Sequence, residues 1–434
     1  MPKSERRVVI TGIGMVSPLG NSCEQVWQSI TSGKSGVGKL TMVPPEPLPT
    51  NIAGEASGFS GNIAEFGELD KLTKRAIKKG LGLMSREIQM GVAAAQHALA
   101  GAAYSENAID PQRIGTMFGS DYIITEPFEF SRGMLNCLNE EGQFEFDKWA
   151  DNGLRQVEPK WLLKYLPNMP ASHVAIYNDL RGPSNSLTVR EASANLAIAE
   201  AYNIIRRGTA EAMVTGSTGS RIHPLRTIHV AMQEQLAEGN GAPESACRPF
   251  DADRSGMVIG EGAGVLVLEE LEFAESRGAK IYGEVLGYGS SSVANKHGVA
   301  DYKTALTNVL KMALETSGLQ AEDFGHVHAH GLSTVKCDAE EAAAIKSVMG
   351  EQTPVVAAKS YMGNLGAGSG IVEVVSSMLA IENDELFPVL NYEKPDPACP
   401  IAVVTEKQSS GKPAVININV TPQGQASAIA IRCL

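Results

Sequence analysis

The sequence lacks the features that mark several specialised classes of protein. Its 434 residues include only six cysteines, scattered and without a C-x-x-C pair, which predicts neither a zinc site nor a disulfide framework. No apolar run approaches the roughly 18 to 20 residues that cross a bilayer. The N-terminus is charged and passes directly into a strand-like run, so we expect no signal peptide. These absences favour a cytoplasmic protein with reduced thiols and no bound metal.

Basic residues are also scarce, since 37 Lys and Arg face 49 Asp and Glu and the net charge is -12. A nucleic-acid binder normally has a basic surplus, so we expect no nucleic-acid partner. Hydrophobic residues make up 43% of the chain and charged residues 20%, which is typical of a folded globular protein. The length predicts two domains or one large duplicated domain.

Short β-rich runs alternate with helical segments, which predicts an α/β architecture. Strands are expected at 8–10, 114–118, 212–215, 264–268, 355–357 and 414–418, and a Gly-rich turn at 11–14. Helices are expected at 84–100, 191–206 and 340–348. Because residues 191–206 are small or aliphatic at nearly every position, that helix should be buried.

Similar elements occur twice, so we expect two α/β halves covering residues 1–270 and 271–434. The least regular region, 128–161, mixes aromatic and acidic residues. We interpret it as an insertion that lies over one face of the core, and not as a linker.

Several motifs occur in a fixed order from about residue 6 to residue 431. They lie at 7–14, 17–20, 167–169, 182–184, 248–251, 260–264, 330–334 with Asp338, and 359–360. By these motifs the chain resembles elongating β-ketoacyl-acyl-carrier-protein synthases, and it is identified as a member of that family. The glycines of 260–264 could also suggest a nucleotide loop, but no helix follows them as that motif requires.

The resemblance implies a thiolase fold, in which duplicated α/β halves form a layered α-β-α-β-α sandwich, usually as a homodimer. Such enzymes carry an acyl group on a cysteine at a helix N-terminus, where the dipole favours the thiolate. Two histidines and an oxyanion hole then assist condensation with malonyl-carrier protein. The resemblance implies no cofactor.

Three positions depart from the family pattern. Glu191 stands where the nucleophilic cysteine is expected, and Asn364 stands where the second histidine is expected. The loop that gates the pocket and supplies an oxyanion N–H is replaced around Thr421. The first histidine is retained as His330. An asparagine can donate a hydrogen bond but cannot carry a proton between reactants.

Glu191 is open to three interpretations. It could act as a base, or as a charged plug at the old nucleophile site. It could also cap the buried helix, because carboxylates are stabilised near helix N-termini. The neighbouring Arg190 could pair with a different acidic group. We expect Glu191, His330 and Asn364 to share one pocket.

Other residues have supporting roles in this resemblance. Lys359 and Glu341 resemble an ion pair beneath the histidines, with Asp338 beside them. A basic cluster that includes Lys74, Arg75 and Lys78 could dock an acidic carrier protein, or it could simply be a solvated helix face.

Three functions fit these residues. A condensing enzyme is hard to reconcile with a missing thiol. A chain-length-factor-like, non-condensing partner fits better: it would bind acyl or carrier-protein groups, as a homodimer or beside an active ketosynthase. The alternative is a decarboxylation or acid-base step that uses Glu191 and His330. Decarboxylation ranks lower, because Glu191 would repel a malonyl carboxylate in a dry pocket.

Overall fold

The computed structural model describes residues 6–46, 48–104, 109–237 and 241–434. The strands are β1 (Val8–Val16), β2 (Val37–Lys39), β3 (Ile52–Gly54), β4 (Ile114–Ser120), β5 (Ser184–Thr188), β6 (Ala212–Ser220), β7 (Ile259–Glu270), β8 (Gly283–Ser292), β9 (Phe324–His328), β10 (Pro354–Val356), β11 (Ala402–Val403), β12 (Ala414–Val420) and β13 (Gln425–Cys433).

The α-helices of this part of the chain complete the alternation of strands and helices. They are α1 (Cys23–Thr31), α2 (Lys71–Gly80), α3 (Arg86–Ala102), α4 (Phe128–Leu135), α5 (Met169–Asn178), α6 (Ser193–Arg206), α7 (Pro224–Gln233), α8 (Leu271–Ser276), α9 (Tyr302–Ser317), α10 (Val335–Met349), α11 (Lys359–Met362) and α12 (Ser369–Glu382). Every strand and helix expected from the sequence is present, with somewhat different ends.

The sheet topology repeats itself. In the first half the strand order is β1-β7-β6-β4-β5, and in the second it is β8-β13-β12-β9-β10. In both halves the first two pairings are antiparallel and the next two are parallel. A short antiparallel pairing of β1 with β8 joins the halves. The predicted duplication is therefore confirmed by the topology.

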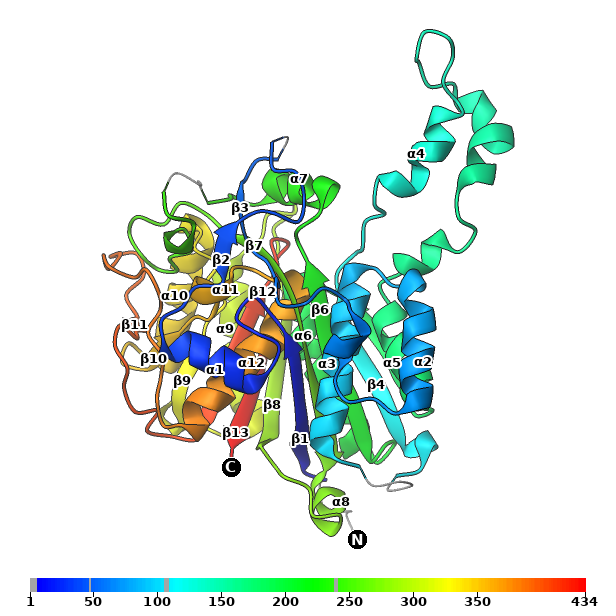
Figure 1. Cartoon of the computed structure of the whole chain (residues 1–434). Coiled ribbons are helices and arrows are strands. Elements are labelled where there is room, and N and C mark those ends of the chain that lie inside the picture. The colour runs from blue at the N-terminus through cyan, green and yellow to red at the C-terminus, as the bar shows by residue number, and fades with distance from the viewer. Residues whose placement is uncertain (1–5, 47, 105–108, 238–240) are drawn as a thin grey trace.

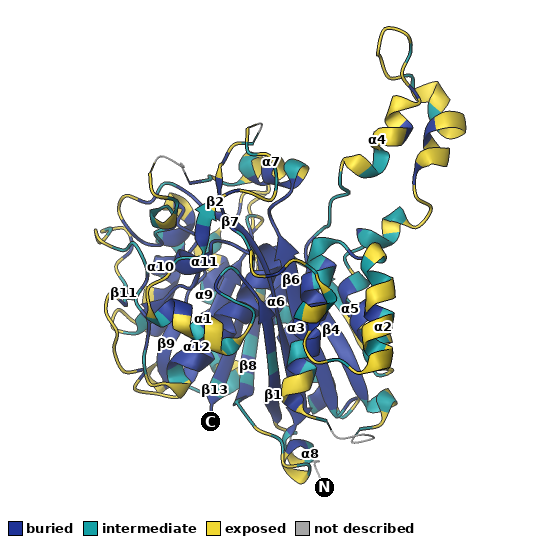
Figure 2. Cartoon of the chain, in the orientation of Figure 1, coloured by how far each residue is buried: buried dark blue, intermediate teal, exposed yellow. Residues whose placement is uncertain are grey.

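Helices form three layers around the two halves of the sheet (Figure 1). Helices α6 and α12 share one hydrophobic core with strands of both halves, so they form the central layer. Helix α3 packs with α5 on the outside of the first half, and α9 packs with α10 on the outside of the second. This is the α-β-α-β-α sandwich that was predicted. Figure 2 shows the dark, buried elements at its centre.

The prediction of a turn at residues 11–14 is wrong, because these residues continue strand β1. Gly12 and Gly14 instead allow helix α3 to pack closely on this strand. A Cβ atom at either position would collide with a backbone carbonyl of helix α3, that of Ala98 or that of Ala94. The glycines therefore let the helix lie directly on the strand.

The insertion forms an arm, which we define as residues 124–165, between β4 and α5. Figure 1 shows that it projects away from the body, so the prediction that it covers a face of the core is wrong. The arm is held by its own aromatic side chains, with the rings of Phe130 and Trp161 4.9 Å apart. Phe128 and Phe146 remain exposed to solvent at 67% and 75%.

Within the described residues, no helix combines the length and the apolar character needed to cross a membrane.

Candidate functional site

Glu191 lies in a tight turn between strand β5 and helix α6. Residues Arg190–Ala192 form a single 3-10 turn, and Arg190 adopts a left-handed φ of 50°. The hydroxyl of Ser193 fixes this turn, because it accepts from the backbone N–H of Val189 and donates to the carbonyl of Ser120. The turn is thus tied to the end of β4, and Glu191 is fully buried.

The carboxylate of Glu191 binds side chains and not the helix terminus. One oxygen, Oε1, forms an ion pair with Arg221 and accepts a hydrogen bond of 3.1 Å from Nδ2 of Asn364. The other, Oε2, lies 3.8 Å from Nε of Arg190. Helix α6 has no side-chain cap, so the helix-cap interpretation of Glu191 is wrong. The expected meeting of Glu191 and Asn364 is observed.

Arg221 belongs to a buried cluster of opposite charges. Its Nη1 lies 3.3 Å from Oε1 of Glu234, which also accepts from Nη2 of Arg190 at 3.0 Å. Arg190 therefore does pair with a second acidic group. A third arginine, Arg226, contacts Asp121 at 2.6 Å. We call these six residues the charge cluster: Arg190, Arg221, Arg226, Asp121, Glu191 and Glu234.

The cluster balances three arginines against three carboxylates in a place that excludes water. None of its side chains is more than 10% exposed, and that of Arg221 is 0% exposed. Burial lowers the pKa of Arg221 to about 10, although the neighbouring Glu234 opposes this effect. Because buried charges must be paired, each member depends on the others. Glu191, which the sequence analysis predicts to stand in place of a nucleophilic cysteine, is a member of this cluster.

His330 lies in the loop after β9, behind the charge cluster. Its Nδ1 is 3.3 Å from Nζ of Lys359. Burial lowers the pKa of His330 well below its usual value, and the charges of Lys359 and Arg221 lower it further. The imidazole is therefore neutral near pH 7. The charge of Arg221 thus acts on His330, while the Arg221 side chain pairs with Glu191, which Asn364 contacts in turn.

The prediction of an ion pair between Lys359 and Glu341 is wrong. Lys359 instead pairs with Glu373 of helix α12. The other oxygen of Glu373 accepts from the side chains of Asn417 and Asn419, at 3.1 and 2.8 Å. Lys359 is thereby tied to helix α12 and strand β12.

Glu341 and Asp338 hold the loop that carries His330. Glu341 accepts the backbone N–H groups of His330 and Gly331 at 2.5 and 2.9 Å, and burial raises its pKa to about 8. Asp338 accepts from Leu332 at 3.1 Å and from other backbone N–H groups, and burial raises its pKa to about 6. Both residues position the loop, which is a structural role.

Thr421 begins the turn that connects β12 to β13. Its backbone N–H donates to the carbonyl of Gln425 at 2.9 Å, so this group is committed to the turn and cannot serve as an oxyanion donor. The turn reaches the charge cluster, because Oε1 of Gln423 lies 3.4 Å from Nη1 of Arg190.

Lys74, Arg75 and Lys78 lie on the exposed face of α2, and none of them contacts Glu191.

The sequence analysis missed Arg221, Arg226, Asp121, Glu234 and Glu373. One signal was present, since two arginines in residues 221–226 directly follow a buried strand. Charges in such a place usually have buried partners.

Sequence profiles of one family match most of the chain. The profile described as "Beta-ketoacyl synthase, N-terminal domain" matches residues 5–274, and "Beta-ketoacyl synthase, C-terminal domain" matches residues 282–393. A 3-oxoacyl-(acyl-carrier-protein) synthase 2 from Synechocystis is 34% identical over 405 residues, which are 92% of this chain and 91% of that protein. The protein of the same description from Staphylococcus aureus is 33% identical over 403 residues, with the same coverage.

Solved structures agree with the sequence profiles. A β-ketoacyl synthase from Burkholderia phymatum superposes with a TM-score of 0.84 at 27% identity, covering 99% of this chain and 100% of that one. A type II polyketide synthase acyl-carrier protein in complex with its ketosynthase gives a TM-score of 0.84 at 25% identity with the same coverage. The ishigamide ketosynthase/chain length factor also gives a TM-score of 0.84 at 25% identity, covering 99% of this chain and 100% of that one.

The charge cluster predicts a strong coupling between Glu191 and Arg221. Replacing Glu191 with Gln should lower the free energy of unfolding by about 3–5 kcal/mol, because Arg221 is left as a buried charge with too few partners. The double variant Glu191→Gln/Arg221→Met should lose less than the sum of the single losses. Chemical denaturation of the four proteins measures this coupling.

Glu200 is the matched control, since its partly exposed carboxylate on the same helix pairs only with Arg207 in the described residues. Glu200→Gln should cost at most about 1 kcal/mol. If Glu191→Gln lowered the free energy of unfolding by an equally small amount, the buried pairing of Glu191 with Arg221 would be contradicted.

The neutral imidazole of His330 predicts a pH effect of known sign. The unfolded state takes up a proton on this side chain below about pH 6.5, whereas the folded state does so only at much lower pH. Stability should therefore fall as the pH falls below 6.5. His330→Asn should reduce this slope by up to about 1.4 kcal/mol per pH unit between pH 5 and 6.5.

The measurement is urea denaturation at several pH values, compared with His297→Asn, which removes an exposed histidine. Glu341 and Asp338 have raised pKa values, so their contribution to stability changes with pH in the direction opposite to that of His330. The quantity to compare is therefore the difference in slope between each variant and the unmodified protein. An unchanged slope in His330→Asn would show that His330 takes up its proton at the same pH in the folded protein as in the unfolded chain.

Proposed function

Because this chain belongs to the β-ketoacyl synthase family and has its thiolase fold, we propose that it is a non-condensing member. It would act in fatty-acid or polyketide biosynthesis like a chain length factor, binding acyl or carrier-protein groups without joining them. The observation that supports this proposal is the pairing of Glu191, predicted from the sequence to replace the nucleophilic cysteine, with Arg221. A carboxylate held in this way cannot carry an acyl group as a thioester.

Four of the six cysteines are unsuited to serve as a substitute nucleophile. Cys247 donates to the carbonyl of Lys359 at 3.0 Å, and burial raises its pKa to about 12. Burial also raises the pKa of Cys399 and Cys433 to about 12 and that of Cys23 to about 11. These thiols stay protonated at neutral pH, and the thiol form is a poor nucleophile.

Asn364 supports the same conclusion. Its Nδ2 donates to Glu191, while its Oδ1 accepts from the backbone N–H of Gly366 at 3.1 Å and from the hydroxyl of Ser369 at 3.3 Å. Both ends of the amide are thus used within the protein. An amide so engaged is not free to polarise a malonyl carbonyl.

Two surfaces support assembly with a second subunit, either a copy of this chain or an active ketosynthase. Strand β5 lies at one end of the strand order, with β4 as its hydrogen-bonded neighbour, so no other strand of the described residues pairs with its second edge. An open edge can pair with another strand. The arm adds exposed apolar side chains close to the same half of the fold (Figure 2). The ishigamide ketosynthase/chain length factor, a similar structure, is the kind of assembly proposed here.

The alternative function is an acid-base or decarboxylation step that uses Glu191 and His330. One observation favours it: with Lys359 at Nδ1, a neutral His330 can present its Nε2–H as a hydrogen-bond donor. It ranks second, because Arg221 and Asn364 already occupy the carboxylate that would have to act as the base.

We predict that the purified protein alone forms no condensation product, because no thiolate stands at the active position. Incubation with acyl- and malonyl-carrier protein, followed by mass spectrometry, should show neither an elongated chain nor an acylated protein. Glu191→Cys should not restore condensation, since Arg221 and Asn364 remain in place. An intact elongating synthase is the positive control.

Two results in this assay would change the proposal. Elongated product from the unmodified protein would overturn it. Conversion of malonyl- to acetyl-carrier protein, lost in Glu191→Gln, would place the alternative function first.

The basic face of α2 is the proposed docking site for the acidic carrier protein. Lys74, Arg75 and Lys78 are exposed and take part in none of the ion pairs found in the described residues. We predict that reversing all three to Glu weakens carrier-protein binding at least about tenfold, because electrostatic attraction becomes repulsion. Isothermal titration calorimetry at low salt measures this, with Lys280, Lys407 and Lys412 reversed together as the control. Equal affinities for the two triple variants would exclude α2 as the docking face.

A further inference from the structure

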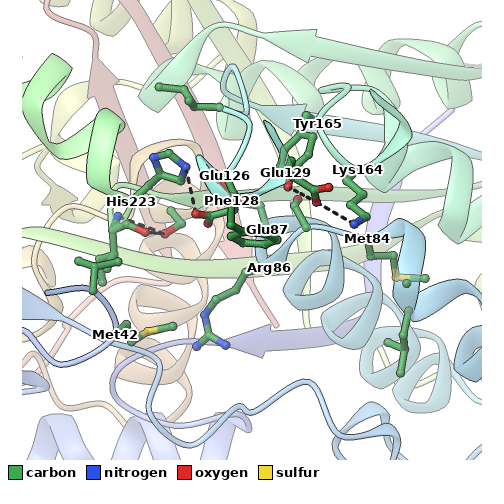
Figure 3. Close-up of a pocket in the computed structure, with 17 residues that line it drawn as sticks. Met42, Met84, Arg86, Glu87, Glu126, Phe128, Glu129, Lys164, Tyr165 and His223 are labelled. Carbon is green, nitrogen blue, oxygen red and sulfur yellow. Dashed lines mark hydrogen bonds and ion pairs between the residues drawn. The ribbon is translucent and has the colours of Figure 1, made fainter. Parts of the chain in front are cut away.

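The arm joins the body at a root where its acidic side chains already have partners. A cavity of about 340 Å³ lies there, with walls from the arm and from the body (Figure 3). Glu129 accepts a hydrogen bond of 2.8 Å from Lys164, and Glu126 lies 3.5 Å from Nε2 of His223. The acidic side chains of the root are therefore engaged within one chain.

The far end of the arm is a short hairpin, which we call the tip and define as residues 138–147. It follows α4 and lies away from the body (Figure 1). Leu138 pairs with Phe144 in an antiparallel bridge, and the backbone N–H of Asn139 donates to the carbonyl of Gln143 at 2.9 Å. Gly142 supplies the left-handed φ of 74° that the turn requires. The side chains of the tip thus project from an ordered backbone.

The tip presents acidic and aromatic side chains to solvent. It contains no basic residue, and its acidic residues are Glu140, Glu141, Glu145 and Asp147. Within the described residues only Glu145 has an ion pair, with Lys148. Phe144 and Phe146 are 42% and 75% exposed. Aromatic side chains are enriched at protein interfaces, so a hairpin of this composition is suited to contact another protein.

Helix α2 has the complementary surface. It contains no acidic residue, and its exposed basic side chains are Lys71, Lys74, Arg75, Lys78 and Lys79. None of them takes part in an ion pair found in the part of the chain that the structure describes. Leu72 is 78% exposed and lies on the same helix face as Arg75 and Lys79, which follow it by three and seven positions. Positive charge beside an apolar side chain matches the carboxylates and rings of the tip.

These two surfaces do not meet within one molecule. Helix α2 packs against α5 on the body, whereas the arm extends away from the body (Figure 1). Side-chain contacts of the tip lie within the arm, such as the rings of Phe144 and Trp149 with centroids 6.3 Å apart. A second copy of this chain carries both surfaces, and two copies related by a twofold axis would make the contact twice.

We propose that the tip of one copy docks on helix α2 of a second copy. The carboxylates of the tip would lie against the basic side chains of α2, and Phe146 would lie against Leu72. This inference rests on the assembly proposed above, because it commits to a copy of this chain as the second subunit and names the contact. The same face of α2 is the proposed docking site of the carrier protein, so one contact would exclude the other.

Sedimentation velocity of the full chain over a range of concentrations tests the contact. We expect the unmodified protein to self-associate. The tip-reversed chain, Glu140→Lys/Glu141→Lys/Asp147→Lys, should self-associate at least about tenfold more weakly, because attraction to α2 becomes repulsion. The absence of self-association in the unmodified protein would overturn the proposal.

The matched control makes the same change of charge at three exposed positions outside the arm, as Glu272→Lys/Glu315→Lys/Glu406→Lys. Its self-association should equal that of the unmodified protein. If both triple variants weakened self-association equally, net charge and not the tip would be responsible, and the proposal would be wrong.

A charge swap identifies the surface that receives the tip. The α2-reversed chain, Lys74→Glu/Arg75→Glu/Lys78→Glu, should self-associate as weakly as the tip-reversed chain. An equimolar mixture of the two should associate again, because each tip then faces an α2 of opposite charge. A mixture that stays dissociated would exclude α2 as the partner of the tip. Condensation activity does not enter this measurement, so that result would leave the proposed non-condensing function intact.

Discussion

A carboxylate and a guanidinium, both without solvent contact, meet where the two halves of the fold converge. Removing two such charges from water costs several kcal/mol for each ion, and pairing offsets this only when the remaining hydrogen-bonding atoms are also engaged. The surroundings of Glu191 and Arg221 meet part of this requirement, although Oε2 of Glu191 and Nε of Arg221 have no hydrogen-bond partner in the described residues. Asn364 reaches the pair from the second half of the chain, and Glu234 takes the other side of Arg221.

The same constraint connects the buried site to the surface. Arg226 contacts Asp121, which belongs to the charge cluster, and also Glu87, which lines the cavity at the root of the arm. A change of charge in the cavity would therefore act on an arginine that the cluster needs. The buried cluster and the cavity lined by Glu87 are neighbours in one electrostatic network.

The duplicated topology explains why chemistry gathers at this place. The turn with Glu191 follows β5, and the loop with His330 follows β9, whose counterpart in the first half is β4. Buried helices α6 and α12 lie back to back between the halves, so the segments that precede them come together. In this chain the fold brings together a set of mutually neutralising side chains there.

Local patterns in the sequence were enough to place six of the strands and three of the helices, because hydrophobic periodicity is a property of neighbouring residues. They could not choose between Glu341 and Glu373 as the partner of Lys359, since both are buried acids on nearby helices. Nor could they show that Arg221 reaches Glu191 across 30 positions of sequence, or that the arm leaves the body. Those outcomes depend on which segments the folded chain brings into contact, because a buried charge is paired by its neighbours in space.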